Sequence, residues 1–428
     1  MILTVFIVFL VLTLLHMPIA FAIGISATLF FVFEPNLMVP IAVQRMVAGT
    51  QSFPLLAIPF FILAGHLTNA SGVTSRLIDF ADALMGHIAG GIAQVSVLLS
   101  LFMGGLSGSS NADVAMETRM LLPKMRERGY GDGFSTAVIA YSSLAVAIIP
   151  PSIGLILYGF VGQVSIERLF IAGIIPGILM SLVTIGCIHI IATSRGYDSE
   201  RKRSRRSFAD VVRTFLRSFW ALLFPVLLVL TIRFGIFTPT EVGAFAVFYT
   251  LFVGMFVYRE MTYAKFKHCI EEAVVDIGVI MLIIAMASII SYVLAYGRVP
   301  FALSSFLTTL PANSVVKYVA VIALLLFAGT IVEGSVLILL LTPILLPVVR
   351  DLGMDPVQFG IVMAIVIQIG GVTPPVGVNM YTVCSIADVP IGTFLRDSWI
   401  FFAGMLLMVA LTSVWPQLSL GLPTLLLD

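Results

Sequence analysis

The sequence is poor in charged residues. Only 11% of its 428 residues are charged, 60% are hydrophobic, and the net charge is +1. Together with a mean hydropathy of +1.11, this composition excludes a soluble domain of this length and predicts an all-α polytopic membrane protein. We therefore expect membrane lipid around the chain and no nucleic-acid partner.

Cysteine is equally scarce, because the chain holds only Cys187, Cys269 and Cys384. Their isolated positions predict neither a disulfide framework nor a metal cluster. The sequence also lacks a GxxxxGK[ST] phosphate-binding loop, any Gly-Lys step and the helical zinc-hydrolase pattern. We expect no enzyme activity, and the energy for any work must come from a source other than a bound nucleotide.

The chain contains an internal repeat at a constant shift of 224 positions. The repeated markers Gly105, Pro123, Gly129, Pro150 and Pro151 fall on Gly329, Pro347, Gly353, Pro374 and Pro375. Matching Gly/Pro interruptions in two hydrophobic halves point to a transporter binding site.

Most of the chain consists of apolar runs, and about 20 apolar residues suffice to cross a bilayer as a helix. The N-terminal run lacks a basic region and a cleavage site, so we expect a retained helix and no signal peptide. The candidate spans are 2–15, 17–33, 53–70, 134–160, 168–194, 219–235, 238–258, 274–296, 359–385 and 394–416.

The orientation follows from the basic segment Arg195–Arg217, which holds eight of the 23 Lys and Arg residues. Short loops of this kind stay cytoplasmic. Five spans precede it if residues 90–128 enter the membrane and return to the same side, which places both termini in the periplasm. An odd number of crossings in each half makes the halves inverted, as in transporters that alternate access around a midplane site.

The first broken element is Gly104–Met116, between two apolar arms too short to span alone. Polar backbone is tolerated at this depth only if it is buried in protein or lines a cavity. We expect a re-entrant hairpin with Ser107, Ser109, Ser110 and Asn111 at its tip. Ser110 and Asp113 resemble a capping box, and Ser109 or Ser110 would begin the returning helix. A serine-rich packing seam is the structural alternative.

The matching tip in the second half is Ala328–Val336. Here Thr330 and Glu333 are spaced as a capping box. An intramembrane carboxylate is costly and usually functional, so Glu333 is a candidate cation ligand or proton carrier, with a helix cap as the alternative.

Each half also contains a Pro-Pro step, which removes backbone donors and leaves carbonyls four residues back without partners, at Val146, Ala147, Gly370 and Gly371. Unwound carbonyls and half-helix ends bind Na⁺ in such proteins. We predict two related cation sites, each between a hairpin tip and a Pro-Pro step. The candidate ligands are Ser107, Ser109, Ser110, Asn111, Pro150, Ser152, Gly154, Gly329, Thr330, Glu333, Thr373, Pro374, Val376 and Gly377.

These motifs, GGLSGSSNADVAM, AIIPPSIGLILYG and GGVTPPVGVNMYTV, resemble the large membrane subunit of tripartite ATP-independent periplasmic (TRAP) transporters, with the sialic acid type favoured. The resemblance covers essentially the whole chain. It implies an inverted-repeat, elevator-type ion-transporter superfamily fold with two re-entrant hairpins and two broken helices. It also implies a bacterial inner-membrane location, Na⁺ coupling, a small four-helix membrane subunit, a periplasmic binding protein, and an acidic solute such as a sialic acid or a C4-dicarboxylate.

Within that superfamily a Ser-Asn-Thr motif at each tip contacts Na⁺ and substrate. This chain has Ser110-Asn111-Ala112 and Gly334-Ser335-Val336 at these positions, so Ser110, Asn111 and Ser335 are the candidate substrate contacts. In both tips the third position departs from the motif. Ligation by the backbone does not depend on that side chain and would survive the change.

The resemblance also implies a division into domains. Residues 1–70 and 218–297 are expected to be scaffold helices, 71–165 and 298–390 the two halves of the transport domain, 166–217 a helix with the basic cytoplasmic loop, and 391–428 the C-terminal helix.

Two alternatives come from other classes of protein. Gly105-Leu106-Ser107-Gly108 spells the GxSG of rhomboid intramembrane proteases, which need a histidine base at the same depth. Four of the five histidines are expected near the cytoplasmic ends of their helices: His66, His87, His189 and His268. Only His16 could lie elsewhere. A protease also has no use for an inverted copy of its site. A passive channel is the second alternative, and ion-independent uptake would favour it.

Overall fold

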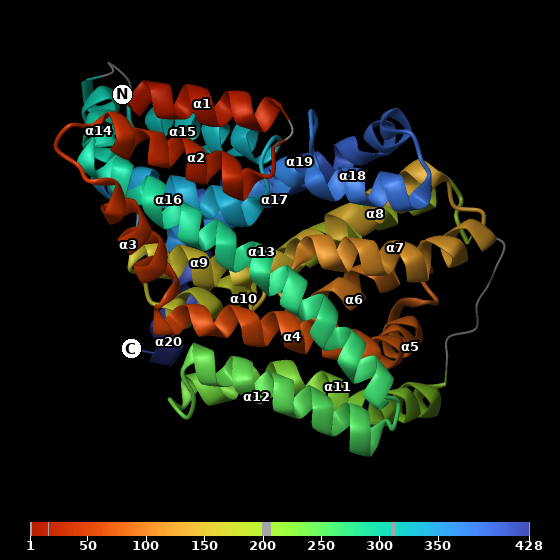
Figure 1. The fold of residues 1–428 in the computed structure, drawn as a ribbon. Helices are drawn as coiled ribbons and strands as arrows, with labels where there is room; N and C mark the ends of the chain where they lie inside the picture. Colours follow the sequence, from red (N-terminus) through yellow and green to blue (C-terminus); the bar gives the residue numbers. More distant parts are fainter. Residues whose placement is uncertain (1, 16, 199–206, 310–312, 428) are drawn as a thin grey trace.

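The computed structural model describes residues 2–15, 17–198, 207–309 and 313–427, and every regular element in these ranges is helical (Figure 1). Seven of the described helices are long and apolar enough to cross a membrane, and shorter apolar helices accompany them. This confirms the all-α polytopic fold. His16 and much of the predicted basic loop lie outside the described residues.

The first half of the chain forms ten helices and two short 3₁₀ segments. They are α1 (Ile2–Leu14), α2 (Ile19–Phe33), α3 (Val39–Thr50), η1 (Phe53–Leu56), α4 (Ala57–Ala70), α5 (Val73–Met85), α6 (Gly91–Ser107), α7 (Ser110–Glu127), α8 (Asp132–Ser142), η2 (Ser143–Ala147), α9 (Ile153–Gly162) and α10 (Ile166–Ser194).

The second half forms ten further helices, with a π-helical segment after α12. They are α11 (Phe208–Arg233), α12 (Pro239–Phe252), η3 (Val253–Val257), α13 (Tyr263–Tyr296), α14 (Val299–Thr309), α15 (Ser314–Gly329), α16 (Gly334–Asp351), α17 (Pro356–Gly371), α18 (Val378–Ala387), α19 (Ile391–Val414) and α20 (Gln417–Leu427).

The Gly/Pro interruptions fall where the repeat predicts them. Each half contains a helical hairpin, α6–α7 or α15–α16, and a helix broken at its Pro-Pro step, α8–α9 or α17–α18. The two Pro-Pro bonds, Pro150-Pro151 and Pro374-Pro375, are both cis. The predicted spans 134–160 and 359–385 are therefore each two helices joined by an irregular segment.

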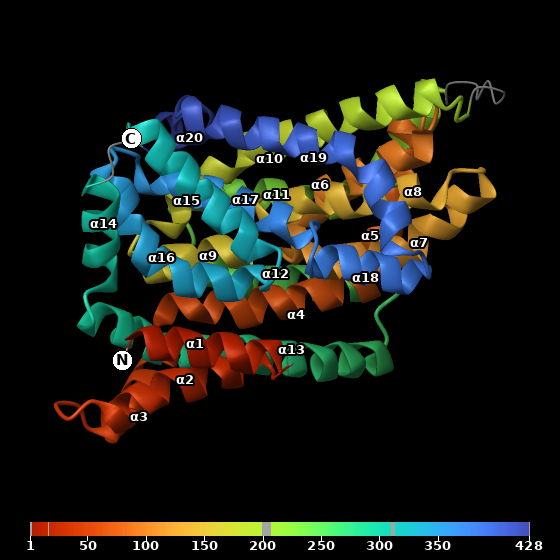
Figure 2. The same cartoon turned by 90° about the horizontal axis from the view of Figure 1, so that it is seen from above.

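The two halves interlock by exchanging partners. The returning helix α7 packs on α18, and its counterpart α16 packs on α9. Likewise α8 packs on α19, and its counterpart α17 packs on α10. Figure 2 shows these helices stacked in one body, with α1, α2, α3 and α13 along one side of it. The returning arm of each hairpin is thus held by the broken helix of the other half.

Helix α13 is longer than the sequence indicated, because it begins at Tyr263 and the predicted span began at 274. Its first turns are polar, so hydropathy missed them. Thr262 caps them by accepting a hydrogen bond from the Lys265 N–H at 3.3 Å. The Lys267–Glu271 ion pair, one turn apart at 3.6 Å, adds support on the surface. The helix crosses in front of α4 and packs on α2, α3, α4 and α16 (Figure 1).

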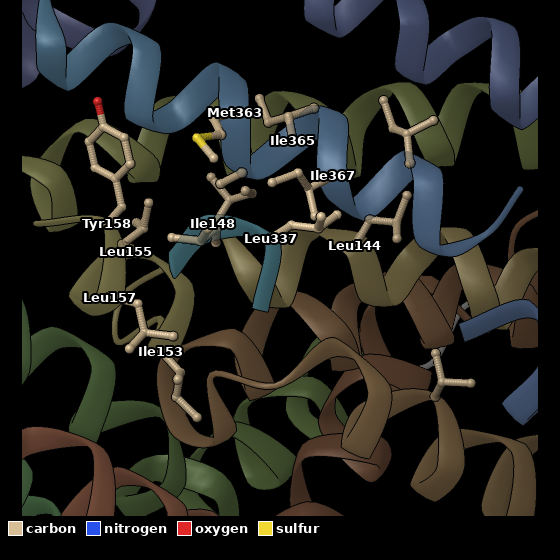
Figure 3. Close-up of a cluster of buried hydrophobic side chains, with 14 of the residues drawn as sticks. Leu144, Ile148, Ile153, Leu155, Leu157, Tyr158, Leu337, Met363, Ile365 and Ile367 are labelled. Atoms are coloured by element: carbon tan, nitrogen blue, oxygen red, sulfur yellow. The ribbon is translucent and has the colours of Figure 1, made fainter. Parts of the chain in front are cut away.

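Apolar side chains from both halves fill the centre of the interlocked body. Figure 3 shows Ile148 and Leu155 of the first half beside Leu337, Met363 and Ile367 of the second. The buried Tyr158 also donates a hydrogen bond to the Pro356 carbonyl at 2.7 Å. The two broken helices therefore share one packed core.

A close approach between the backbones of two helices predicts one substitution. A Cβ added at Gly370 of α17 would lie 2.5 Å from the backbone carbon of Gly329 in α15. Gly370→Ala should therefore lower the free energy of unfolding by about 1–3 kcal/mol. Gly186→Ala in α10 is the control, because nothing lies within 4 Å of its added Cβ. Thermal unfolding of the purified protein measures both, and equal melting temperatures for the two variants would contradict this packing.

Candidate functional site

The first hairpin tip is a sharp turn between α6 and α7. Gly108 takes the left-handed conformation at φ 62°, and a Cβ at that position would also lie 2.5 Å from the Pro151 carbonyl oxygen. Ser109 then caps α7, since its hydroxyl accepts a hydrogen bond from the Ala112 N–H at 3.5 Å. The expectation that Ser109 or Ser110 begins the returning helix is confirmed. The predicted Ser110–Asp113 capping box is wrong, because the left-handed glycine places the cap one residue earlier.

The two polar residues after the cap reach across to the second half. The Ser110 hydroxyl donates to Gln368 Oε1 at 2.7 Å and accepts from Asn379 Nδ2 at 3.2 Å. Asn111 Oδ1 accepts from the Thr382 hydroxyl at 2.7 Å. The tip of the first hairpin is therefore bound to the second broken helix on both sides of its break.

The break in the first half satisfies its own backbone. Pro151 removes the donor for the Ala147 carbonyl, and the Ser152 hydroxyl donates to that carbonyl instead, at 2.5 Å. Ser152 also caps α9 by accepting from the Leu155 N–H at 3.2 Å. The backbone can thus be irregular here without leaving this carbonyl unpaired.

The second tip has a different cap from the one predicted. Thr330 ends α15, and its hydroxyl donates to the Phe327 carbonyl at 2.8 Å. Glu333 caps α16 directly, because its carboxylate accepts from the N–H groups of Ser335 at 2.9 Å and Val336 at 3.3 Å. The Thr330–Glu333 capping box is therefore wrong. The helix-cap alternative for Glu333 is the arrangement observed.

The second tip and the second break are joined through the backbone. The Thr330 carbonyl accepts from the N–H groups of Val376 at 3.0 Å and Gly377 at 2.9 Å. The Thr373 hydroxyl donates to the Ile369 carbonyl at 2.6 Å. The second hairpin is therefore fastened at its tip to the break of its own half.

A central cavity of about 860 Å³ lies between the two tips on one side and α2, α4 and α13 on the other. The candidate residues that line it are Ser107, Ser109, Ser110, Asn111, Gly154, Gly329, Glu333 and Ser335. The candidates that do not line it are Pro150, Ser152, Thr330, Thr373, Pro374, Val376 and Gly377. The structure thus brings both tips to one cavity and leaves most break residues behind it.

Oxygen atoms without partners are the positions at which a hard cation could bind. Ser107 Oγ is buried beside the first tip and has no hydrogen-bond partner among the described residues. In the second half the hydroxyls of Thr330 and Thr373 already donate to carbonyls, and the Glu333 carboxylate caps a helix. The first predicted site thus offers a free side-chain ligand, whereas the second would depend on backbone oxygens.

The sequence interpretation missed a buried carboxyl pair inside the first hairpin. Asp113 and Glu117, one turn apart on α7, are 1% and 0% exposed. The Ser100 hydroxyl lies 2.8 Å from Asp113 Oδ2 and 2.7 Å from Glu117 Oε1, and the Ser96 hydroxyl donates to the other Glu117 oxygen. A hydroxyl has one hydrogen, so it cannot serve both carboxylates. Neither carboxyl forms an ion pair among the described residues, and the cluster therefore needs one further positive charge or proton.

A signal for this pair exists in the sequence. Ser96 and Ser100 are spaced by four, as are Asp113 and Glu117, and residues four apart share one face of a helix. Two antiparallel arms would bring these faces together. The hydropathy pattern alone predicts that the same carboxylates lie on a polar surface.

The protease alternative finds no support in the geometry. Ser107 and His66 line the same cavity, but the Ser107 hydroxyl has no partner among the described residues. His66 Nε2 lies 2.8 Å from Asp276 Oδ2 instead. The nucleophile–base hydrogen bond that such an enzyme needs is not formed.

Two interlocked inverted halves around a cavity lined by hairpin tips define the class of secondary transporters. The family model for the tripartite ATP-independent periplasmic transporter, DctM component, matches residues 6–418. The chain therefore belongs to the TRAP large permease family, whose members are multi-pass proteins of the bacterial inner membrane that work with a small membrane subunit and a periplasmic binding protein.

Individual relatives agree with the family. The chain is 36% identical over 411 residues to the sialic acid TRAP transporter large permease protein SiaM of Vibrio cholerae, and the match covers 96% of each chain. It is 34% identical over 403 residues to the C4-dicarboxylate TRAP transporter large permease protein DctM of Pseudomonas aeruginosa, covering 94% and 93%. The crystal structure of the Alcanivorax borkumensis YdaH transporter shares the fold, with a TM-score of 0.56, 12% identity and coverage of 94% and 98%.

The missing hydrogen in the carboxyl pair predicts different stabilities for two substitutions of Glu117. Glu117→Gln should fold normally, because the amide supplies the missing hydrogen to Ser100. Glu117→Ala should cost about 1–3 kcal/mol, because it leaves buried polar groups unpaired. Glu127→Ala, at an exposed position near the end of α7, is the control. Thermal unfolding decides the matter: if Glu117→Gln destabilises as much as Glu117→Ala, both carboxyls are charged.

Proposed function

We propose that this chain is the Na⁺-coupled permease subunit of an importer for an acidic organic solute. Sialic acid is the favoured solute and a C4-dicarboxylate the second. The observation that carries the proposal is the central cavity, which both hairpin tips line from one side and α4 and α13 line from the other. A solute bound there contacts both repeats at once, as a midplane transporter site requires.

An elevator motion is consistent with the packing. The hairpins and broken helices hold one another through α7 on α18 and α16 on α9. On the opposite side of the cavity, α13 packs on α2, α3 and α4. We infer that the first group moves as a body along the second and carries the cavity contents across the membrane.

The N-terminus of α7 supports an anionic solute. Both α7 and α16 begin at the cavity, and the N-terminus of α7 presents backbone N–H groups and a partial positive charge, whereas the Glu333 carboxylate already caps α16. Ser110, Asn111 and Ser335 stand at these two ends. A carboxylate would be held at the N-terminus of α7 by backbone N–H donors. No residue of the chain separates sialic acid from a C4-dicarboxylate, so the lean toward sialic acid rests on the relatives' names.

Na⁺ is proposed as the coupling ion because it is a hard cation that prefers oxygen ligands, and the tips supply oxygen atoms. Ser107 Oγ and the carbonyls of the first break would hold one ion, and the backbone around Thr330 and Gly377 would hold a second. Each positive charge moved inward at ~100 mV supplies roughly 2.3 kcal/mol, which corresponds to about fiftyfold accumulation. Two or more Na⁺ per monoanion would therefore concentrate a scarce solute.

The proposed assembly follows the family. A four-helix small subunit would cover part of the apolar outer face, and a periplasmic binding protein would deliver the solute. Both termini would lie in the periplasm and the loop 195–217 in the cytoplasm. Large exposed apolar side chains on α1, α2 and α12, such as Leu3, Phe33 and Phe248, fit burial in lipid or against that subunit.

Coupling is tested by uptake into proteoliposomes that contain the chain with its small subunit and receive binding protein loaded with N-acetylneuraminate. With an inward Na⁺ gradient and no ATP, solute should accumulate, and replacing Na⁺ by choline should abolish accumulation. Equal uptake in choline would contradict the proposal and would favour a passive channel.

The role of the first tip is tested by Ser110→Ala and Asn111→Ala. Each removes a polar contact worth on the order of 1–3 kcal/mol, so the Na⁺ concentration for half-maximal uptake should rise about five- to hundredfold. Ser207→Ala is the control, because Ser207 is exposed just before α11 and should tolerate the change. The assignment is wrong if Asn111→Ala destabilises the purified protein while the folded remainder keeps its Na⁺ dependence.

A further inference from the structure

His66 stands at the junction of two cavities. It lies on α4 and lines the central cavity together with Asp276 of α13. It also lines a neighbouring pocket of about 470 Å³, which Glu272 and His268 line as well. His66 Nε2 lies 2.8 Å from Asp276 Oδ2, and His66 Nδ1 lies 3.3 Å from Glu272 Oε2. The two carboxylates are one turn apart on α13, and each contacts one nitrogen of the imidazole ring.

This arrangement gives each ring nitrogen of His66 a carboxylate partner. A neutral imidazole has one N–H, whereas the imidazolium donates from both nitrogens. Both nitrogens of His66 face a carboxylate oxygen, so the ring donates to a carboxylate whichever nitrogen carries the hydrogen. Among the described residues that line the central cavity there is no Lys or Arg. His66 is therefore the basic side chain that an anion in this cavity would meet.

The carboxylates on either side of His66 have different surroundings. Asp276 lines the central cavity and its side chain is 57% exposed. Glu272 lines only the neighbouring pocket and also lies 3.3 Å from His268 Nε2. Asp276 is free to turn away from the ring on the cavity side, while Glu272 keeps the ring oriented from the side of the neighbouring pocket.

We propose that His66 binds an anionic oxygen of the solute from the scaffold side, and that Asp276 occupies this place when no solute is bound. The proposal rests on the proposed transport of an acidic solute and adds a specificity-determining residue to it. One end of the solute meets the hairpin tips, and an anionic oxygen replaces the Asp276 carboxylate on His66 Nε2. The solute class is thus an acid long enough to reach from the tips to α4.

The exchange has a consequence for the transport cycle. His66 belongs to α4, which lies across the cavity from the tips. If the tips move relative to α4, the contact with His66 exists only in the state described here. When the solute leaves, Asp276 returns to His66 and competes with rebinding. The ion pair therefore favours release on one side of the membrane.

The experiment compares three substitutions in the full chain, purified with its small membrane subunit at saturating Na⁺. Binding of N-acetylneuraminate and of succinate is measured by calorimetry for His66→Gln, Asp276→Asn and His268→Gln. His66→Gln should weaken binding of the accepted acid by about tenfold or more, because it removes the imidazole N–H donor. Asp276→Asn should strengthen binding, because it removes the competing carboxylate. His268→Gln is the matched control, since His268 contacts Glu272 but does not line the central cavity.

The opposite changes in affinity expected for His66→Gln and Asp276→Asn distinguish this role from a structural one. If the ion pair only held α4 against α13, removing either partner would weaken binding in the same direction, and that result would overturn the proposal. Unchanged affinity in His66→Gln would also overturn it. A failure of the proposed function is distinct, because the wild-type protein would then bind neither acid, and both proposals would fall together.

Discussion

The fold depends on satisfying backbone polar groups where two helices break inside an apolar protein. A hydrocarbon environment offers these groups no water, so each one needs a partner from the protein. At the first break the Ser152 hydroxyl serves the Ala147 carbonyl. At the second, the Thr330 carbonyl receives the N–H groups of Val376 and Gly377. In the second half, the hairpin tip is therefore a structural requirement of the break, and the tip and the break stay together.

This requirement also explains why the cavity forms where it does. The bonds between the second tip and its break, and the left-handed turn at Gly108 in the first tip, place the N-termini of α7 and α16 at the same cavity. The Ser110 contacts with Gln368 and Asn379 then tie the first tip to the second half. The two tips differ in chemistry, because the first has the Ser107 hydroxyl, which is unpartnered among the described residues, and the second caps its helix with Glu333. The backbone is thus pseudo-symmetric, whereas the side chains with which the two tips line the cavity differ.

The sequence was informative wherever a residue type alone determines the backbone. Prolines and glycines at a constant shift predicted the hairpins, the breaks and the inverted repeat, because few other residues interrupt an apolar helix. The caps were each displaced, since the left-handed turn at Gly108 and the direct cap by Glu333 depend on local geometry. Partners that meet only in the folded chain stayed hidden: Ser110 and Gln368 are 258 positions apart. The buried Asp113–Glu117 pair looks like a polar surface until its neighbours are known.

The central claim is that the tips and breaks move together relative to the scaffold, and distances between spin labels test it most directly. In a cysteine-free background, one label at the exposed Val275 of α13 and one at the exposed Tyr381 of α18 span the two bodies. A second pair, at Lys124 of α7 and Tyr381, lies within one body. The account predicts two populations for the first pair, whose ratio shifts with Na⁺ and solute, and one constant distance for the second. A single unchanging distance for the first pair, or a shifting distance for the second, would contradict it.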